Sequence, residues 1–441
     1  MQYNGCVIGT RTTGYEINAP VVLSRDDLKQ HLHLIGKTGT GKSTLLKTLL
    51  YDDLLNDRDF VLIDPLGTLA EAIVDGVPAN RTNDVIYFAP GHDLEHCVGI
   101  NPLWNVPPDL RHLVADHIVA SFMHIWNASL EDTPRLVYVL YHSIRLLLDA
   151  PDGETLLGLP RLLVNDNYRA FLLKHSRDLA VIDFWRHEFP KDEKIRANVI
   201  GPIQNKIGML LAPPPLRNVL GQRRSTLNIA RLMNERGTLI CNLAKGKLGE
   251  TTTKLMGALI ATAVAQVAEE RISIAPEERR PICLYVDEIQ NVATSAFAGV
   301  LSELRNFNLS LIASHQYLAQ LPDELQEAVL NNCANSVVFR AGAGKHTRRL
   351  ADELDLENDK ILSSTPNYKA WTKLLRNGVP SEAFLMDTVQ TEPPARDRKD
   401  AVIAHTRTRH TRPRAAVEAE IAKNMGREQR PQFDPPNFIF K

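Results

Sequence analysis

Residues 31–50 read HLHLIGKTGTGKSTLLKTLL, and within them Gly-x-x-x-x-Gly-Lys-Ser runs from Gly36 to Ser43. The apolar residues before Gly36 predict a short buried strand, and the residues from Lys42 onward predict a helix. A glycine-rich loop between a strand and a helix is the setting in which this motif binds phosphate groups. The stretch therefore predicts a phosphate-binding loop in a protein that alternates strands and helices.

Each residue type in this loop has a chemical reason. Gly36, Gly39 and Gly41 allow the backbone to curl until its N–H groups converge on phosphate oxygens. Lys42 directs its charge at the β- and γ-phosphates, and the Ser43 hydroxyl ligates Mg²⁺. The predicted nucleotide-binding residues of this loop are Gly36, Thr38, Gly39, Thr40, Gly41, Lys42, Ser43 and Thr44.

The same sequence indicates which cofactors to expect. A guanine-recognition motif of the form Asn-Lys-x-Asp is not found, because NKIG at residues 205–208 ends without the aspartate. ATP with Mg²⁺ is therefore the predicted cofactor. His92, His96 and Cys97 lie close together in the sequence, but they lack the fixed spacing and the fourth ligand of a structural metal site. We predict no metal beyond Mg²⁺.

Short apolar runs recur along the chain, and helical stretches separate them. Several runs are apolar at consecutive positions, which is typical of strands that are buried on both faces of a sheet. Strands that alternate with helices favour a parallel α/β sheet. The runs are residues 31–36, 60–65, 85–90, 238–243, 282–288, 309–314 and 335–340.

This alternation stops in the middle of the chain. There one helical pattern follows another, interrupted by prolines, and the sequence has no convincing strand pattern. We predict an all-helical domain, residues 105–226, inserted between two parts of one α/β core, residues 1–104 and 227–390. Residues 391–441 form a basic, proline-containing C-terminal tail in this prediction.

A second set of polar residues follows the apolar strands. In ICLYVDEIQ (282–290) Asp287 ends the strand and Glu288 comes next. An aspartate in this position holds the Mg²⁺ of a bound nucleotide, and the adjacent carboxylate can activate the attacking water. The pair therefore predicts ATP hydrolysis as well as ATP binding. Asp64, at the end of FVLID (60–64), has two interpretations: it belongs to the nucleotide site, or it caps the next helix.

Two further side chains complete the predicted catalytic set. The run LSLIASHQ ends at His315 and Gln316, and a polar residue at this strand tip can sense the γ-phosphate; Gln316 is the favoured candidate. Arg305 lies between the acidic strand and this strand, so we expect it near the nucleotide edge of the sheet. It is either a finger that reaches the γ-phosphate of a neighbouring subunit or a solvated surface arginine.

The composition is that of an ordinary globular protein. Of 441 residues 44% are hydrophobic and 23% charged, which excludes a disordered or collagen-like chain. With 51 basic against 52 acidic residues, any contact with nucleic acid requires a local basic patch. The five cysteines form no CxxC pair, which favours a reducing compartment. The apolar stretch Leu255–Ala268 has only 14 residues and predicts a buried helix, so the expected location is cytoplasmic.

Several segments resemble the HerA/FtsK superfamily of P-loop ATPases, and most closely its TraG/TraD-like branch, the type IV secretion coupling proteins. The resemblance extends over roughly residues 15–390. The matching segments are Gly36–Ser43, IDPLGTLAE (63–71), GINPLW (99–104), FWRHEF (184–189), LAKGKLGE (243–250), YVDEIQN (285–291), LSELRN (301–306) and ASHQYLAQL (313–321).

The resemblance implies a RecA-like core with an all-α domain, assembled as a homohexameric ring that uses ATP to move DNA through its pore. It implies that Lys42 is the phosphate-loop lysine and that Asp287 and Glu288 are the acidic pair. It further implies that Arg305 is the arginine finger and Gln316 the glutamine sensor.

Two departures from that family leave the pathway open. The sequence has no N-terminal transmembrane anchor of the kind that membrane-bound coupling proteins carry. In VVFRAGAGKHTRR (337–349) Lys345 and His346 stand where related members often have an acidic residue. The predicted function is a DNA translocase in conjugative DNA transfer, with a membrane-bound secretion apparatus or an effector protein as a further partner. The alternatives are a HerA-like motor in DNA-end processing or phage defence, and an ATP-dependent scaffold that does not translocate.

The candidate DNA contacts are basic residues near glycines. Lys245 and Lys247 lie in LAKGKLGE, where a flexible loop could touch phosphates in a pore. Arg223 and Arg224 are weaker candidates in the helical region. Each pair has the alternative of being ordinary solvated side chains.

Overall fold

The computed structural model describes residues 5–128, 131–150 and 153–426. These residues form two compact units, and the chain passes between them several times. The first unit contains the described residues of 1–92, 116–133 and 228–410, and the second contains those of 93–115, 134–227 and 411–441.

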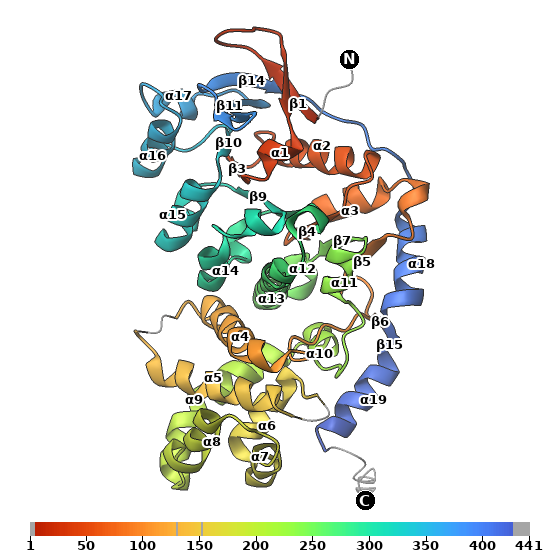
Figure 1. The fold of residues 1–441 in the computed structure, drawn as a ribbon, viewed down its shortest axis with the longest axis vertical. Coiled ribbons are helices and arrows are strands. Elements are labelled where there is room, and N and C mark those ends of the chain that lie inside the picture. Colours follow the sequence, from red (N-terminus) through yellow and green to blue (C-terminus); the bar gives the residue numbers. More distant parts are fainter. Residues whose placement is uncertain (1–4, 129–130, 151–152, 427–441) are drawn as a thin grey trace, which may run out of the picture. The chain divides into compact units, whose positions relative to one another are not determined.

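One sheet of eleven strands dominates the first unit (Figure 1). Its parallel half consists, in spatial order, of β10 (Asn335–Val338), β3 (Leu32–Ile35), β9 (Leu309–His315), β8 (Ile282–Val286), β4 (Phe60–Asp64), β7 (Thr238–Asn242) and β5 (Val85–Phe88). The antiparallel half continues from β10 through β11 (Lys369–Lys373), β14 (Phe384–Thr388), β1 (Cys6–Arg11) and β2 (Pro20–Leu23). A separate hairpin pairs β12 (Leu375–Arg376) with β13 (Val379–Pro380).

All seven apolar runs of the sequence are strands of the parallel half, so the predicted α/β class is confirmed. Every residue of β8 and of β9 is buried, as expected for strands covered on both faces. The antiparallel half was not predicted. Its strand β11 alternates buried and half-buried residues and contains two lysines, a pattern too short and too polar to stand out in the sequence.

Helices flank this sheet. Those of the first unit are α1 (Arg25–Leu28), α2 (Lys42–Leu55), α3 (Thr68–Asp75), α11 (Ile229–Asn234), α12 (Lys245–Leu248), α13 (Glu250–Glu270), α14 (Ser295–Val300), α15 (Asp323–Asn332), α16 (Lys345–Glu353), α17 (Lys360–Ser363) and α18 (Lys399–His410). Helix α13 contains the stretch Leu255–Ala268, most of whose residues are buried, which confirms the predicted buried helix. Within the described residues no helix combines the length and the apolar character that a bilayer span requires.

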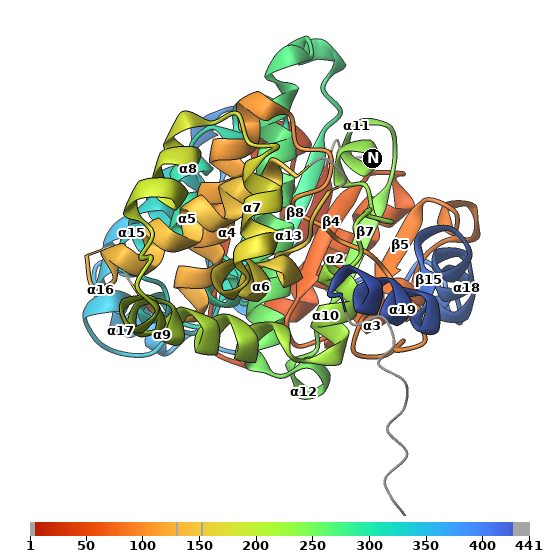
Figure 2. The ribbon, with the colours of Figure 1, turned by 90° about the horizontal axis from the view of Figure 1, so that it is seen from below.

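Within the predicted C-terminal tail, residues 391–426 include two helices, Lys399–His410 and Arg414–Asn424, while residues 427–441 lie outside the described residues. Helix α18 lies beside β5, the last strand of the parallel half, as Figure 2 shows. The Tyr87 backbone N–H donates to the Thr406 hydroxyl oxygen over 3.0 Å, and Val402 is fully buried. A helix that covers an edge strand in this way satisfies backbone groups that would otherwise be open to pairing, which is why this stretch folds onto the core.

Helices also make up most of the second unit, and the described residues of 105–226 contain no strand. The helices are α5 (Pro134–Leu148), α6 (Leu159–Val164), α7 (Asp166–Leu173), α8 (Leu179–Asp183), α9 (Glu193–Leu211), α10 (Pro214–Leu220) and α19 (Arg414–Asn424), while α4 (Arg111–Ile125) continues from this unit into the first. A short ribbon pairs β6 (His96–Cys97) with β15 (Arg412–Pro413).

The second unit begins earlier than the predicted boundary at residue 104. The Ile100 N–H donates to the Val219 carbonyl over 3.0 Å, and the Thr226 N–H donates to the Gly99 carbonyl over 2.9 Å. These backbone bonds attach residues 99–100 to the helical unit. Residues 93–104 therefore cluster with that unit and not with the sheet.

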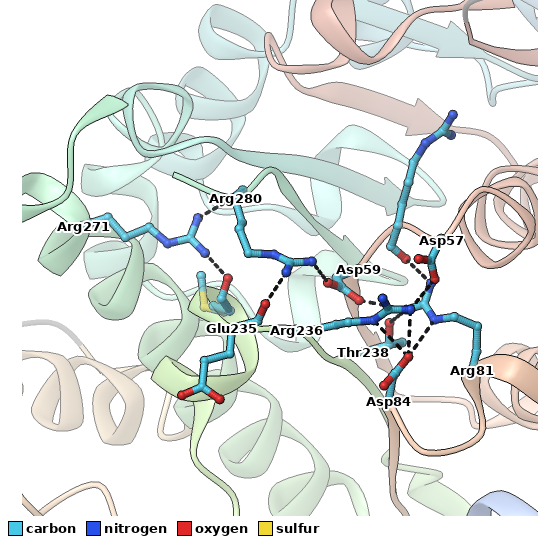
Figure 3. A network of polar contacts seen from close by, with 11 residues as sticks. Asp57, Asp59, Arg81, Asp84, Glu235, Arg236, Thr238, Arg271 and Arg280 are labelled. Carbon is cyan, nitrogen blue, oxygen red and sulfur yellow. Dashed lines mark hydrogen bonds and ion pairs between the residues drawn. The ribbon is translucent and has the colours of Figure 1, made fainter. Parts of the chain in front are cut away.

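A polar network fixes the amino ends of the parallel strands (Figure 3). The fully buried Arg81 donates to Asp59 Oδ1 over 2.8 Å and to the Thr238 hydroxyl over 3.1 Å. Arg280 reaches the other oxygen of Asp59 over 2.6 Å. Arg271 is also fully buried, and its four hydrogen bonds go to three carbonyls and the Asn234 side chain. This edge of the sheet is therefore occupied by structural contacts.

Candidate nucleotide site

The phosphate loop lies at the opposite, carboxyl edge, between the end of β3 and the start of α2. Gly41 has φ 123°, and a Cβ there would meet the Phe339 ring at 2.8 Å, so only glycine fits. Gly39 has φ 77° with open space around it. Gly41 also precedes α2 without a side-chain cap, which leaves the first N–H groups of the helix available to an anion.

Lys42 is the first residue of α2 and is buried. Its ammonium group donates to the Gly36 carbonyl over 2.5 Å, so the side chain folds back across the loop. Burial lowers the pKa of Lys42, while the charges of Glu288 and Asp287 oppose this shift. Ser43 follows Lys42 and is exposed. The predicted lysine and hydroxyl are thus adjacent at the helix start, with both acidic residues close to the lysine.

Asp287 follows β8 directly and is 5% exposed. The Ser314 hydroxyl, on the neighbouring strand β9, donates to its Oδ1. Burial raises the pKa of Asp287 to about 6, the charges of Asp64 and Glu288 add to the effect, and Ser314 and Lys42 oppose it. A buried carboxylate and an exposed hydroxyl are hard oxygen ligands, so Asp287 and Ser43 are suited to hold the predicted Mg²⁺.

Glu288 has an unusual backbone conformation with a geometric consequence. Consecutive residues of an extended strand point to opposite faces of the sheet, but Glu288 is in the left-handed region at φ 51° and ψ 60°. This turn brings the second carboxylate near Lys42 as well. Gln316 Nε2 donates to Glu288 Oε1 over 3.0 Å, and Gln290 Nε2 donates to Oε2 over 2.7 Å. Both carboxylate oxygens are therefore held in place.

Strand order explains why these groups meet. Strand β9 lies between β3, which leads into the phosphate loop, and β8, which ends at the acidic pair. Ser314 and Gln316 are two residues apart, so they project on the same side and reach Asp287 and Glu288 respectively. His315 projects on the other side and pairs with His33 of β3, Nε2 to Nε2, over 2.7 Å. Of the two candidates at this strand tip, Gln316 lies in the site.

Three polar residues in or beside the site were not predicted: Ser314 and Gln290, which contact its carboxylates, and His33, the partner of His315. Ser314 could have been found, because it precedes Gln316 by two positions and so shares its side of the strand. His33 alternates with apolar residues in HLHLIG, but nothing in the sequence indicates its partner. Gln290 contacts Glu288 only because of the left-handed turn at Glu288, and no sequence pattern predicts that turn.

Asp64 makes the contacts that its helix-cap interpretation requires, while its membership of the nucleotide site stays a prediction. Its Oδ1 accepts from the Leu66 N–H over 2.8 Å and its Oδ2 accepts from the Ala70 N–H over 2.9 Å. Both oxygens are thus committed to the start of α3, where a negative charge is favourable. Asp64 is fully buried, and its contribution to the site is its charge, which raises the pKa of Asp287.

The expectation that Arg305 lies near the nucleotide edge is wrong. Arg305 is exposed in the short 3₁₀ helix Leu304–Phe307, just before β9 begins, and its Nη1 donates to Gln30 Oε1 ahead of β3. The phosphate loop and Glu288 lie where the strands end. Strand β9 has seven residues, roughly 20 Å at about 3.3 Å per residue, so Arg305 cannot reach its own chain's nucleotide.

The candidate DNA contacts lie in different units. Lys245 and Lys247 are exposed on α12, which follows β7 at the carboxyl edge of the sheet. Arg223 and Arg224 belong to the second unit.

Comparison with known proteins agrees with this architecture. The plasmid coupling protein TrwB, in complex with a non-hydrolysable GTP analogue, superposes with a TM-score of 0.62 at 17% identity over 86% of this chain and 89% of TrwB. TrwB with a non-hydrolysable ATP analogue gives 0.61 at 16% identity over 90% and 91%. VirB4 of Thermoanaerobacter pseudethanolicus gives 0.58 at 14% over 89% and 98%. No family model and no curated protein matches the sequence.

At such low identity these similarities establish the fold. The chain has the RecA-like fold of TrwB and VirB4, as the resemblance seen in the sequence implied for its core.

Proposed function

We propose that this chain hydrolyses ATP and uses the energy, as a homohexameric ring, to move DNA in a conjugative type of transfer. The proposal rests on one observation: four predicted catalytic side chains lie together at one edge of the sheet, namely Lys42, Asp287, Glu288 and Gln316. A site for binding alone would not need a second carboxylate whose two oxygens are both held by amides.

The geometry suggests how hydrolysis would proceed. Lys42 would leave the Gly36 carbonyl and bind the phosphate oxygens, with the first N–H groups of α2. Bound Mg²⁺, held by Ser43 and Asp287, would supply positive charge to the phosphates. Glu288 would accept a proton from the attacking water, and Gln316, which is already bonded to Glu288, would orient that water or the γ-phosphate.

Several finer features belong to this proposal. The nucleotide is ATP, the cargo is DNA, and Lys245 and Lys247 line its path. The protein acts in the cytoplasm with a secretion apparatus or an effector as partner. The similarity to TrwB, a bacterial conjugative coupling protein, supports conjugative transfer over the alternatives in repair or defence. A complex of TrwB with ADP and Mg²⁺ supports binding of an adenine nucleotide with Mg²⁺.

ATP turnover with and without DNA tests the proposal. Lys42→Ala should lower the turnover rate by about 10²-fold or more, because its charge stabilises the phosphates in the transition state. Glu288→Gln should bind ATP normally but hydrolyse it about 10²–10⁴-fold more slowly, because the amide cannot accept the proton. Glu277→Gln removes an exposed carboxylate of the same unit and should leave the rate unchanged.

DNA should raise the wild-type turnover rate. Equal ATP turnover by wild type and Glu288→Gln would show that Glu288 is not the general base. A protein that hydrolyses ATP but is neither stimulated by DNA nor assembled into rings with an ATP analogue would be a scaffold or a remodeller, and the translocase proposal would fail.

A further inference from the structure

The second unit contains a positively charged cavity that is separate from the nucleotide site. Its volume is about 540 Å³, and its lining residues are Arg223, Arg224, Ser225, Thr226, Arg412 and Glu420. The lining thus contains three guanidinium groups and one carboxylate, and a second carboxylate, that of Glu154, lies 3.9 Å from Arg223. Because this lining is basic and polar, the cavity suits an anion and not an apolar ligand.

Backbone contacts hold the loop that carries two of these arginines. The Arg223 N–H donates to Glu420 Oε1 over 3.1 Å, and its carbonyl accepts from Asn101 Nδ2 over 2.9 Å. Three residues later the Thr226 N–H donates to the Gly99 carbonyl over 2.9 Å. A loop fixed at both ends loses little conformational entropy when a ligand binds.

The arginine side chains, by contrast, retain unused donors. The guanidinium of Arg223 lies 3.9 Å from Glu154, too far for a hydrogen bond, and its Nε is buried without a partner among the described residues. Arg224 is exposed, and in the described part of the chain no carboxylate pairs with it. Arg412 uses Nη1 to bond Glu420 Oε2 over 2.5 Å, which holds it in place and leaves further N–H groups free.

This arrangement matches phosphate chemistry. The planar guanidinium group donates two parallel hydrogen bonds to a phosphate, which lysine cannot do. The cavity is many times larger than the about 30 Å³ of a water molecule, so it has room for more than one phosphate group. A sugar–phosphate backbone offers successive phosphates to Arg223, Arg224 and Arg412.

We infer that this cavity is a phosphate-binding site of the helical unit and that its ligand is the backbone of DNA. The choice of DNA rests on the proposed function. The site itself rests on the three arginines, and it does not require ATP to be bound or hydrolysed.

Equilibrium binding of a fluorescein-labelled DNA duplex to the full chain, without nucleotide and over a series of salt concentrations, tests this inference. The double variant Arg223→Gln with Arg224→Gln should weaken binding about tenfold or more at low salt. It should also reduce the slope of log affinity against log salt by about 1.8, because each lost phosphate contact contributes about 0.9. Arg412→Gln should reduce the slope by about 0.9, an effect that a purely structural role would not produce.

The matched control is Arg177→Gln with Arg186→Gln, which removes the same charge from exposed positions of the same unit. Wild-type affinity and slope are expected for it. If the double variant of the cavity does not fold, Arg224→Gln alone serves, because its side chain is exposed. Wild-type affinity and slope in the cavity variants would overturn the inference.

Two further measurements distinguish DNA from a free phosphate ion and the cavity from the ATP site. If inorganic phosphate binds to wild type but not to the double variant in calorimetry, while DNA affinity is unchanged, the cavity takes a free phosphate and the inference for DNA is wrong. The basal ATP turnover of the cavity variants, without DNA, should equal that of wild type. If DNA binds these variants as it binds wild type and stimulates their ATP turnover equally, the cavity is not a DNA-binding site. That result would not affect the translocase proposal.

Discussion

Asp287 lies in surroundings that oppose its own negative charge. Asp287 is buried beside two other carboxylates, Asp64 and Glu288. Glu288 has a left-handed backbone conformation, which costs a residue with a side chain roughly 1–2 kcal/mol. Sites that bind a cation and a phosphate are often strained in this way, because the ligands supply the missing partners. The nucleotide-free site should therefore be less stable than its surroundings.

Asp287→Asn should stabilise the nucleotide-free protein. Burial raises the pKa of Asp287 from 3.8 to about 6, so the folded protein loses stability as the pH rises from about 4 to 6, and at pH 8 the loss is complete. Asparagine cannot ionise and still accepts the Ser314 hydrogen bond. We expect a higher melting temperature at pH 8, equivalent to at most about 3 kcal/mol, measured without metal.

The control is Asp26→Asn, whose side chain is 83% exposed and which should melt like wild type. Addition of ATP and Mg²⁺ should reduce or reverse the advantage of Asp287→Asn, because the bound cation favours the charged carboxylate. A lower melting temperature for Asp287→Asn without nucleotide would show that its charge is not destabilising.

At the scale of elements, the sequence predicted what depends on local pattern. The seven runs of consecutive apolar residues became the parallel strands, because burial on both faces requires such runs. The phosphate loop and the acidic pair were recognisable because each occupies a strand end. The antiparallel strands and α18 were not predicted, since their half-polar patterns are completed only by their contacts with neighbouring elements.

The order of the strands in the sheet was the main feature that could not be predicted from the sequence. Without it, Gln316 and Ser314 could not be assigned to Glu288 and Asp287 as partners, because pairing between distant segments leaves no local trace. The error on Arg305 has a different cause. Arg305 comes just before β9, so chain order alone places it at the amino edge of the sheet, whichever strands are neighbours.

The histidine pair between β3 and β9 predicts acid sensitivity. His33 and His315 are fully buried, and burial lowers the pKa of His33 from 6.5 to about 4. The unfolded chain therefore binds the proton more readily, and stability is lost as the pH falls from about 6.5 toward 4. His33→Gln can still donate to His315 but does not titrate, so it should lose less stability on acidification.

Urea denaturation at pH 7 and pH 5 provides the measurement. The difference between the two pH values should be smaller in His33→Gln than in wild type, by about 2 kcal/mol. His187→Gln, an exposed position with 69% side-chain exposure, should retain the wild-type difference. His31 contributes in the same direction, because burial lowers its pKa to about 4 as well, so some acid sensitivity should remain. An unchanged pH difference in His33→Gln would contradict the assignment.

At the scale of the whole molecule, the two edges of the sheet carry different functional residues. The carboxyl edge carries the phosphate loop and the acidic pair, and the amino edge carries Arg305. A residue on one edge can serve a site on the other only if a second copy of the chain supplies it. Such a contact is head-to-tail, and repeated head-to-tail contacts close into a ring when the rotation allows. The position of Arg305 thus excludes a role in its own subunit's nucleotide site and leaves a role between subunits or none.

Arg305→Ala should therefore bind ATP normally, because the change lies about 20 Å from the site of its own chain. It should hydrolyse ATP on the order of 10³-fold more slowly, because a finger stabilises transition-state charge. Arg231→Ala, which removes an exposed arginine paired with Glu235, should retain wild-type turnover.

The decisive measurement mixes Arg305→Ala with Lys42→Ala subunits. Some interfaces then combine an intact Lys42 with an intact Arg305 from the neighbour, and turnover should partly return. If proven mixed rings remain as inactive as either parent, Arg305 is not a finger and its role is confined to the surface of its own subunit.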